Sequence, residues 1–189
     1  MTRRIILFFI IILSTYTYCG SIEIDMRARE LELIAIETKR IEFIREEQLN
    51  LFLNAMGFHE SRNNPEVYNE FGYIGMFQFG QSARNATGYG HIKYSDFVKN
   101  PSIWPKQEQI SAMKTLLQKN ELRLLQYIIK TPYKIGNITI TKSGLLASAH
   151  LAGSDNVRRF LESNGVYNPK DAYGTSITKY MIMFSSYEF

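Results

Sequence analysis

Apolar residues recur at helical spacing over most of the chain. The clearest stripe precedes residue 60, where Leu49, Phe52, Leu53 and Met56 share one helix face and Glu60 is the next position in phase. This helix should end before Pro65, because the residue before a proline avoids the helical region. We also predict helices over 106–129, 143–152, 155–163 and 176–184, with caps at Ser154/Asp155 and Thr175 for the last two.

The remaining segments carry different patterns. Residues 133–142 alternate between apolar and polar positions around Gly136-Asn137, which predicts a small β-hairpin. Residues 65–105 hold many of the Gly and Pro residues and should form loops with short helical turns, where a binding cleft is commonly found. The sequence therefore predicts a mainly α fold, a single helical domain with a small β-hairpin.

The first 47 residues differ in composition from the rest. Arg3 and Arg4, the apolar run of residues 5–13 and small residues around Cys19 predict an export leader over 1–21, with an uncleaved anchor as the alternative. Cys19 is the one cysteine of the chain, and its position after the apolar run resembles that of the lipid-modified cysteine of a lipoprotein. Secretion without lipid attachment is an equally simple interpretation. We predict that residues 22–47 form a charged helical spacer and that residues 48–189 form the functional domain.

Charge and composition narrow the choice of partners. The net charge of +4 suits an anionic polymer such as the bacterial cell wall, and the N-terminus is a candidate for attachment to a membrane. No dense stripe of Lys and Arg with interleaved aromatics is present in the sequence, so nucleic acid is a poor candidate. His59-Glu60 is followed by Asn63 where a zinc-protease helix needs a second His, which argues against a metal site.

Glu60 is the strongest candidate for chemistry. A carboxylate on a face that should be buried costs free energy unless it is paired or functional. A carboxyl group kept protonated by apolar surroundings can donate a proton to a glycosidic oxygen, which is otherwise a poor leaving group. A salt bridge to Arg62 at the helix end is the structural alternative.

The surrounding motif resembles a known family. The segment HESRNNPEVYNEFGYIGMFQF contains Glu60-Ser61, then Pro65, Gly72 and Gly75-Met76-Phe77-Gln78, with Gln78 placed 18 residues after Glu60. Further along come Ala149-His150-Leu151-Ala152-Gly153 and Tyr180. Over residues 48–184 this order resembles the lysozyme-like lytic transglycosylases of the soluble-transglycosylase type.

The resemblance implies a function. It implies cleavage of the β-1,4 bond between N-acetylmuramic acid and N-acetylglucosamine, with Glu60 as acid and then base and with no cofactor. It also implies that the N-acetyl group of the substrate acts as nucleophile and that the C6 hydroxyl closes a 1,6-anhydro ring. A hydrolytic muramidase and a non-catalytic peptidoglycan-binding scaffold remain the alternatives, the latter because His150 and Leu151 replace a Tyr and an Asn of the family pattern.

The same motif supplies the candidate binding residues. We expect substrate contacts from Ser61, Met76, Phe77, Gln78 and Tyr180. His150 has three readings: a hydrogen bond to the sugar or to Glu60, a general base, or a core histidine with satisfied hydrogen bonds. Glu66, Glu70 and Asp96 are the nearby acidic residues that could supply a second carboxylate, and none lies in a suggestive position.

Overall fold

The computed structural model describes residues 2–171 and 173–189, with side chains from residue 25 onward. The chain divides into two compact units, Met1–Arg45 and Glu46–Phe189. Helix α1 (Thr2–Ser61) has residues in both units. The two helices expected before residue 62 are therefore one helix, because residues 22–56 contain neither Gly nor Pro to interrupt it.

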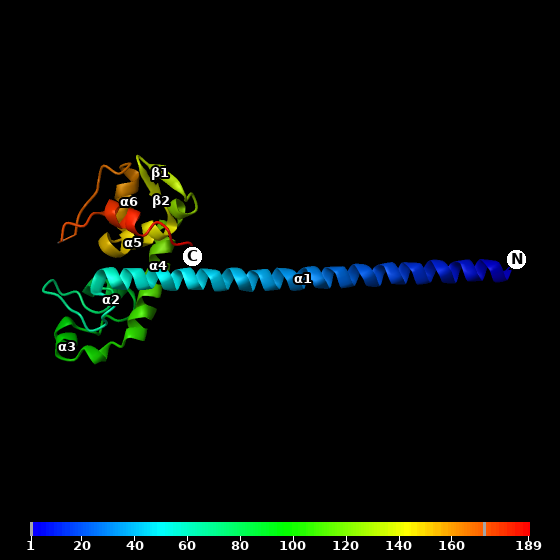
Figure 1. Cartoon of the computed structure of the whole chain (residues 1–189), viewed down its shortest axis with the longest axis horizontal. Helices are drawn as coiled ribbons and strands as arrows, with labels where there is room; N and C mark the ends of the chain where they lie inside the picture. Colours follow the sequence, from blue (N-terminus) through cyan, green and yellow to red (C-terminus); the bar gives the residue numbers. More distant parts are fainter. Residues whose placement is uncertain (1, 172) are drawn as a thin grey trace. The chain divides into compact units, whose positions relative to one another are not determined.

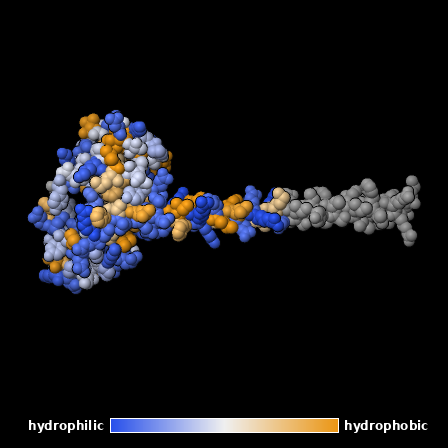
Figure 2. Space-filling model, viewed as in Figure 1, coloured by the Kyte–Doolittle hydropathy of each residue, from blue (hydrophilic) through white to orange (hydrophobic). Residues whose placement is uncertain are grey.

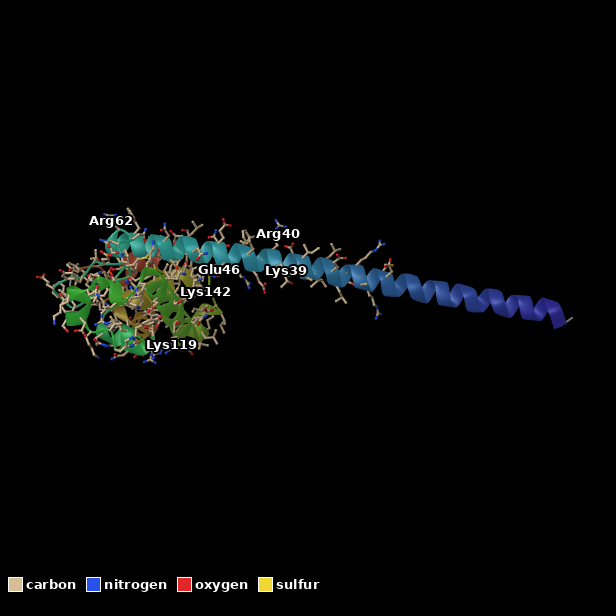
Figure 3. All side chains as sticks on the ribbon, turned by 90° about the horizontal axis from the view of Figure 1, so that it is seen from below. Lys39, Arg40, Glu46, Arg62, Lys119 and Lys142 are labelled. Carbon is tan, nitrogen blue, oxygen red and sulfur yellow. The ribbon has the colours of Figure 1, made fainter. Side chains whose placement is uncertain are left out.

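The described part of the first unit, residues 25–45, consists of exposed helix. Its charged side chains form local ion pairs, such as Arg29 with Asp25 at 3.2 Å and Arg40 with Glu37 at 3.6 Å. Apolar side chains, Leu31 among them, are also exposed and alternate with charged ones (Figure 2), and Lys39 and Arg40 project outward (Figure 3). Among the helices described in full, none has the length and apolar character needed to cross a membrane.

The second unit is mainly helical. After the end of α1 it contains α2 (Gln81–Ala86), α3 (Tyr94–Lys99), a 3-10 turn η1 (Pro101–Ile103), α4 (Lys106–Ile128), β1 (Tyr133–Ile135), β2 (Ile138–Ile140), α5 (Lys142–Ala152), α6 (Ser154–Glu162) and α7 (Ile177–Met183). The prediction of a mainly α fold with a small β-hairpin is confirmed.

The hairpin forms where the alternating pattern placed it. β1 and β2 are antiparallel, with Tyr133 opposite Ile140 and Ile135 opposite Ile138. Gly136 and Asn137 form the two-residue turn, and Gly136 has a φ of +57°, a backbone conformation that glycine adopts without steric cost.

Helix α4 organises the second unit. It starts near α2 and α3 and ends at the hairpin, beside which α5 and α6 lie (Figure 1). Its buried face, which includes Met113, Leu117 and Leu124, belongs to a core that also contains Phe52 and Trp104. This packing joins the loop-rich segment of residues 62–105 to the C-terminal helices.

Surface ion pairs also connect α4 to its neighbours. Lys114 contacts Glu46 at 2.6 Å, and Glu121 contacts Lys142 at 2.8 Å; Glu46 and Lys142 are labelled in Figure 3. Their side chains are partly exposed, so each pair adds on the order of 0–1 kcal/mol.

Two helix starts differ from the predicted caps. Helix α6 begins at Ser154 and has no side-chain cap, because its N-cap residue is Gly153, which has no side chain that could accept a hydrogen bond. Helix α7 is capped by Ser176, whose hydroxyl accepts a hydrogen bond from the amide of Lys179 at 3.3 Å, so the cap lies one residue after Thr175.

Candidate functional site

Glu60 lies in the last turn of α1, on the stripe that carries the buried side chains of Phe52 and Met56. Its own side chain is 16% exposed. It lines a cleft of about 380 Å³ together with residues of the 67–78 loop, of α5 and of the C-terminal segment. We call this space the Glu60 cleft; its lining residues are His59, Glu60, Val67, Asn69, Tyr73, Gln78, His150, Leu151, Asp171, Tyr173, Thr175 and Tyr180.

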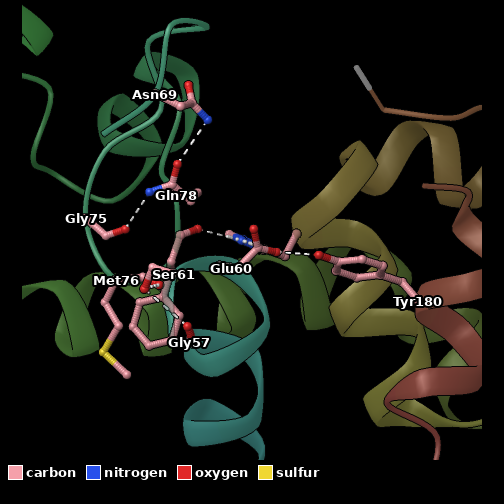
Figure 4. A network of polar contacts seen from close by, with 10 residues as sticks. Gly57, Glu60, Ser61, Asn69, Gly75, Met76, Gln78 and Tyr180 are labelled. Atoms are coloured by element: carbon pink, nitrogen blue, oxygen red, sulfur yellow. Dashed lines mark hydrogen bonds and ion pairs between the residues drawn. The ribbon is translucent and has the colours of Figure 1, made fainter. Parts of the chain in front are cut away.

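Tyr180 holds the Glu60 carboxyl group. Its hydroxyl donates a hydrogen bond to Oε1 of Glu60 at 2.5 Å (Figure 4). Burial, together with the negative charge of Glu60, raises the pKa of Tyr180 above its ordinary value, so the phenol stays protonated and remains a donor. Among the described residues none donates to Oε2 of Glu60, and that oxygen is left for a proton or a ligand.

His150 comes close to Glu60 without bonding to it. Its Nε2 lies 3.9 Å from Oε1 of Glu60, beyond hydrogen-bond distance, and 2.9 Å from the carbonyl oxygen of Phe77. A carbonyl can only accept, so Nε2 carries the proton and donates to Phe77. This corrects the expectation of a hydrogen bond from His150 to Glu60. The imidazole positions the loop that faces the acid, while the ring also lines the cleft.

Gln78 and Asn69 form an amide pair at the opposite wall. The side-chain amide of Asn69 donates to Oε1 of Gln78 at 3.0 Å, and Nε2 of Gln78 donates to the carbonyl of Gly75 at 2.9 Å (Figure 4). The other side of the Asn69 amide accepts backbone N–H groups from Phe71 and Tyr73. Gln78, an expected site residue, lies in the cleft, whereas Asn69 was missed.

Three expected contact residues have other surroundings. The hydroxyl of Ser61 donates to the carbonyl of Met76 at 2.7 Å and ties the end of α1 to the loop (Figure 4). The side chains of Met76 and Phe77 are 3% and 0% exposed and belong to the hydrophobic core. None of the three lines the Glu60 cleft, and each helps to hold or shape the loop. Direct contact of their side chains with a substrate stays a prediction.

Gln109 of α4 holds the loop that contains Met76 through hydrogen bonds to its backbone. It is fully buried on α4, its Oε1 accepts from the amide of Met76 at 2.6 Å, and its Nε2 donates to the carbonyls of Pro65 and Trp104. Gly75 has a φ of +78°, and a Cβ there would overlap Oε1 of Gln109. A polar residue among the apolar positions of a predicted helix was the signal that could have identified Gln109.

Asp171 adds a second carboxylate to the cleft. Its Oδ1 accepts the backbone N–H groups of Tyr173 at 3.0 Å and Thr175 at 2.7 Å. The acidic residues considered from the sequence, Glu66, Glu70 and Asp96, do not line this cleft. The spacing Asp171-x-x-Gly174 in a turn-rich segment was the available signal.

Exposed aromatic rings surround the cleft. Tyr73 is 42% and Tyr173 67% exposed, and both line it. Phe71 packs edge-on against Tyr173 with ring centroids 5.4 Å apart. An aromatic and amide-lined cleft with one buried carboxyl and one hydrogen-bonded carboxylate suits a neutral, polyhydroxylated ligand.

No protein-family model, curated protein or solved structure matches this chain. Within the described residues, no group of three or more His, Cys, Asp or Glu side chains is arranged to hold a metal ion.

Proposed function

We propose that residues 48–189 form a lysozyme-like domain that acts as a peptidoglycan lytic transglycosylase. In this proposal Glu60 is the acid and then the base in cleavage of the bond between N-acetylmuramic acid and N-acetylglucosamine. The observation that supports it most is the state of Glu60. Its carboxyl group is largely buried, Tyr180 donates to one oxygen, and the other oxygen has no donor among the described residues. A carboxyl group in that arrangement has one oxygen fixed by Tyr180 and the other oxygen, Oε2, open to exchange a proton with a glycosidic oxygen.

The first step breaks the glycosidic bond. Oε2 of Glu60 gives its proton to the bridging oxygen, and the bond between C1 of N-acetylmuramic acid and that oxygen breaks with its electron pair. The carbonyl oxygen of the N-acetyl group on the same sugar bonds to C1 and takes the place of a protein nucleophile. The leaving N-acetylglucosamine departs with a free hydroxyl, and Glu60 becomes a carboxylate. The hydrogen bond from Tyr180 stabilises that carboxylate.

The second step closes the ring. The Glu60 carboxylate takes the proton of the C6 hydroxyl, whose oxygen attacks C1 and displaces the N-acetyl oxygen. The product has a 1,6-anhydro end, and Glu60 regains its proton. No water is consumed, so the reaction is a lyase reaction.

The test is digestion of purified peptidoglycan by the wild-type chain and by Glu60→Gln, with products analysed by mass. Gln has nearly the same shape and accepts the hydrogen bond from Tyr180, but its amide cannot donate a proton as an acid. We expect 1,6-anhydro products from the wild type and at least a thousandfold slower release from Glu60→Gln. Glu66→Gln, at an exposed acid outside the cleft, is the matched control and should keep wild-type activity.

Asp171 favours one alternative, a hydrolytic muramidase. A carboxylate held in the same cleft by two backbone N–H groups could orient a water molecule for attack on C1. Reducing ends instead of anhydro ends, lost in Asp171→Asn, would support the hydrolase and contradict the lyase. Binding of peptidoglycan without any product would support the non-catalytic scaffold.

The proposed substrate lies outside the cytoplasm, which agrees with the export leader expected over residues 1–21. That leader and the lipid attachment considered for Cys19 lie outside the residues described in side-chain detail. Both stay predictions.

A further inference from the structure

Two turns of the second unit have the same construction. The first has the sequence Asn-Glu-Phe-Gly-Tyr over residues 69–73, and the second begins at Asp171 and ends at Thr175. In each turn a side-chain oxygen of the first residue accepts the backbone N–H groups of the third and fifth residues. The N–H group of the first residue donates to the carbonyl of the fifth, and the fourth residue is a glycine with a φ of +82°.

The third residue of each turn is aromatic, and the two rings meet. Phe71 and Tyr173 have ring centroids 5.4 Å apart and ring planes at 87°, the edge-to-face arrangement that aromatic pairs prefer. Phe71 is 50% and Tyr173 67% exposed, so the pair lies outside the core. Figure 1 shows the loop after α1 and the loop after α6 projecting at the same side of the second unit. We call the contact between Phe71 and Tyr173 the aromatic bridge.

The aromatic bridge lies where two hollow spaces meet. A second cavity of about 720 Å³ adjoins the Glu60 cleft. Tyr173 lines the Glu60 cleft, and Phe71 lines the second cavity. Four residues line both spaces and form their common wall: Tyr73, Gln78, His150 and Leu151. A chain of sugars that occupies both spaces therefore passes the junction at which the two rings touch.

Hydrogen bonds at the base of each turn hold the two rings in place. The hydroxyl of Tyr94 donates to the carbonyl of Asn69 at 2.9 Å, and the side-chain amide of Asn69 donates to Gln78 at 3.0 Å. In the second turn, Lys170 and Ser176 pair as an antiparallel bridge. An exposed ring contact is weak by itself, but two hydrogen-bonded turns restrict the positions that the rings can take.

We propose that the aromatic bridge closes the groove over the substrate, so that a glycan strand enters by its end and is cleaved from that end. This proposal rests on the proposed function, because it concerns how the strand reaches Glu60. A polymer enters an open groove from the side at any point of its length. Beneath a bridge that joins the two walls, it has to pass lengthwise, and only its end can be admitted. The aromatic bridge is thus a determinant of which bonds in a strand are cleaved.

The test follows strand length during the early digestion of long, purified glycan strands. Newly formed ends count the cuts, and mass analysis gives the length of the products. The wild-type chain should release disaccharides from the start, while the remaining strands nearly keep their length. Phe71→Ala and Tyr173→Ala remove one side of the bridge and should release long fragments first. At one cut per strand, their mean strand length should fall toward half, as it does when bonds are cut at random.

Two control variants separate the bridge from a general loss of aromatic side chains. Phe58→Ala removes a ring that is also 50% exposed but lines neither space, and it should keep the wild-type pattern. Tyr173→Phe keeps the ring and should also cleave from the strand end. Interior cleavage by the wild type, or an unchanged pattern in both Phe71→Ala and Tyr173→Ala, would overturn the proposal.

A binding measurement separates this proposal from the proposed function. Immobilised Glu60→Gln is exposed to long and to short strands at equal mass, and the initial association rate is recorded. Long strands carry fewer ends per mass, so the rate should fall with strand length, and adding Phe71→Ala should remove that dependence. This result without cleavage by the wild type would contradict the lyase and keep the bridge. A rate independent of length in Glu60→Gln, or no binding of any strand, would overturn the bridge.

Discussion

At the scale of single residues, the state of Glu60 depends on a partner far away in sequence. Tyr180 lies 120 positions later, yet its phenol is the donor that holds the carboxyl group. Both side chains are largely buried, at 16% exposure for Glu60 and 2% for Tyr180. In such surroundings a charged hydrogen bond is less screened than at the surface, and burial together with the charge of Glu60 raises the pKa of the Tyr180 phenol.

The first prediction concerns Tyr180 at alkaline pH. Because its pKa lies above the ordinary value of 10.0 in the folded chain, the unfolded chain loses this proton first as the pH rises. The contribution to stability is therefore complete below pH 10 and declines above it. Between pH 10 and 12 the loss of stability of the wild type relative to Tyr180→Phe, which has no proton to lose, should steepen toward a limit of about 1.4 kcal/mol per pH unit.

Urea unfolding at several pH values measures this difference. Tyr173→Phe removes a hydroxyl from an exposed ring and should keep the wild-type slope. If stability falls with pH equally steeply in the wild type and in Tyr180→Phe, folding does not raise the pKa of Tyr180.

At the scale of elements, Gln109 of α4 makes more hydrogen bonds to the 62–80 loop than Ser61 or His150 does. Gln109 satisfies the amide of Met76 and the carbonyls of Pro65 and Trp104, and all of these bonds lie in or beside the core. The loop has little regular structure of its own, so its shape, and with it the wall of the Glu60 cleft, depends on this amide.

The second prediction removes that amide. Gln109→Leu keeps a similar volume but leaves one backbone N–H and two carbonyls without their partner, at a cost of roughly 1–3 kcal/mol for each group that water cannot reach. We expect a total loss of about 3–5 kcal/mol in the free energy of unfolding. Gln107→Leu, on the exposed side of the same helix, is the control and should change stability by less than about 0.5 kcal/mol. A similar loss in both variants would contradict the role of Gln109.

The third prediction separates backbone strain from close approach. Gly75 and Gly88 both have positive φ values, +78° and +90°, but only at Gly75 would a Cβ meet the Gln109 side chain. Gly88→Ala should therefore cost about 1 kcal/mol from strain alone. Gly75→Ala should cost at least 2 kcal/mol more from overpacking, on the order of the usual penalty. Thermal unfolding of the two variants measures this, and equal losses would exclude the steric contribution.

At the scale of the whole molecule, the core lies in one of the two units. Its buried apolar side chains begin at Phe52, and the partly buried residues around it begin at Leu49. Residues 25–45 contribute no side chain to this core. The second unit thus has the buried surface that a domain of its length needs.

The fourth prediction follows from the location of the core within residues 46–189. Residues 46–189 expressed alone should unfold in a single cooperative transition, with a midpoint within about 3 °C of the transition seen in the full chain. The same fragment should retain the cleavage activity of the full chain. A fragment that is unfolded at 25 °C would show that the preceding helix supplies stability that the core does not.

The sequence by itself determined the helical face that carries Glu60, the helices from α4 onward, the hairpin turn at Gly136-Asn137 and the loop-rich segment before α4. These features depend on local periodicity and turn chemistry, which neighbouring residues encode directly. The cap of α7 lies one residue after the predicted Thr175, at Ser176, because Ser is at least as good an N-cap residue as Thr and the two are adjacent.

The tertiary structure alone decided which polar groups meet. It brought Tyr180 to Glu60, turned His150 toward the carbonyl of Phe77, and placed Asp171 in the same cleft. It also left Arg84 and Asn120 buried with unpaired donors. Periodicity identifies the face on which a residue lies, but the partner of a buried polar atom depends on how distant segments pack, and no local pattern encodes that.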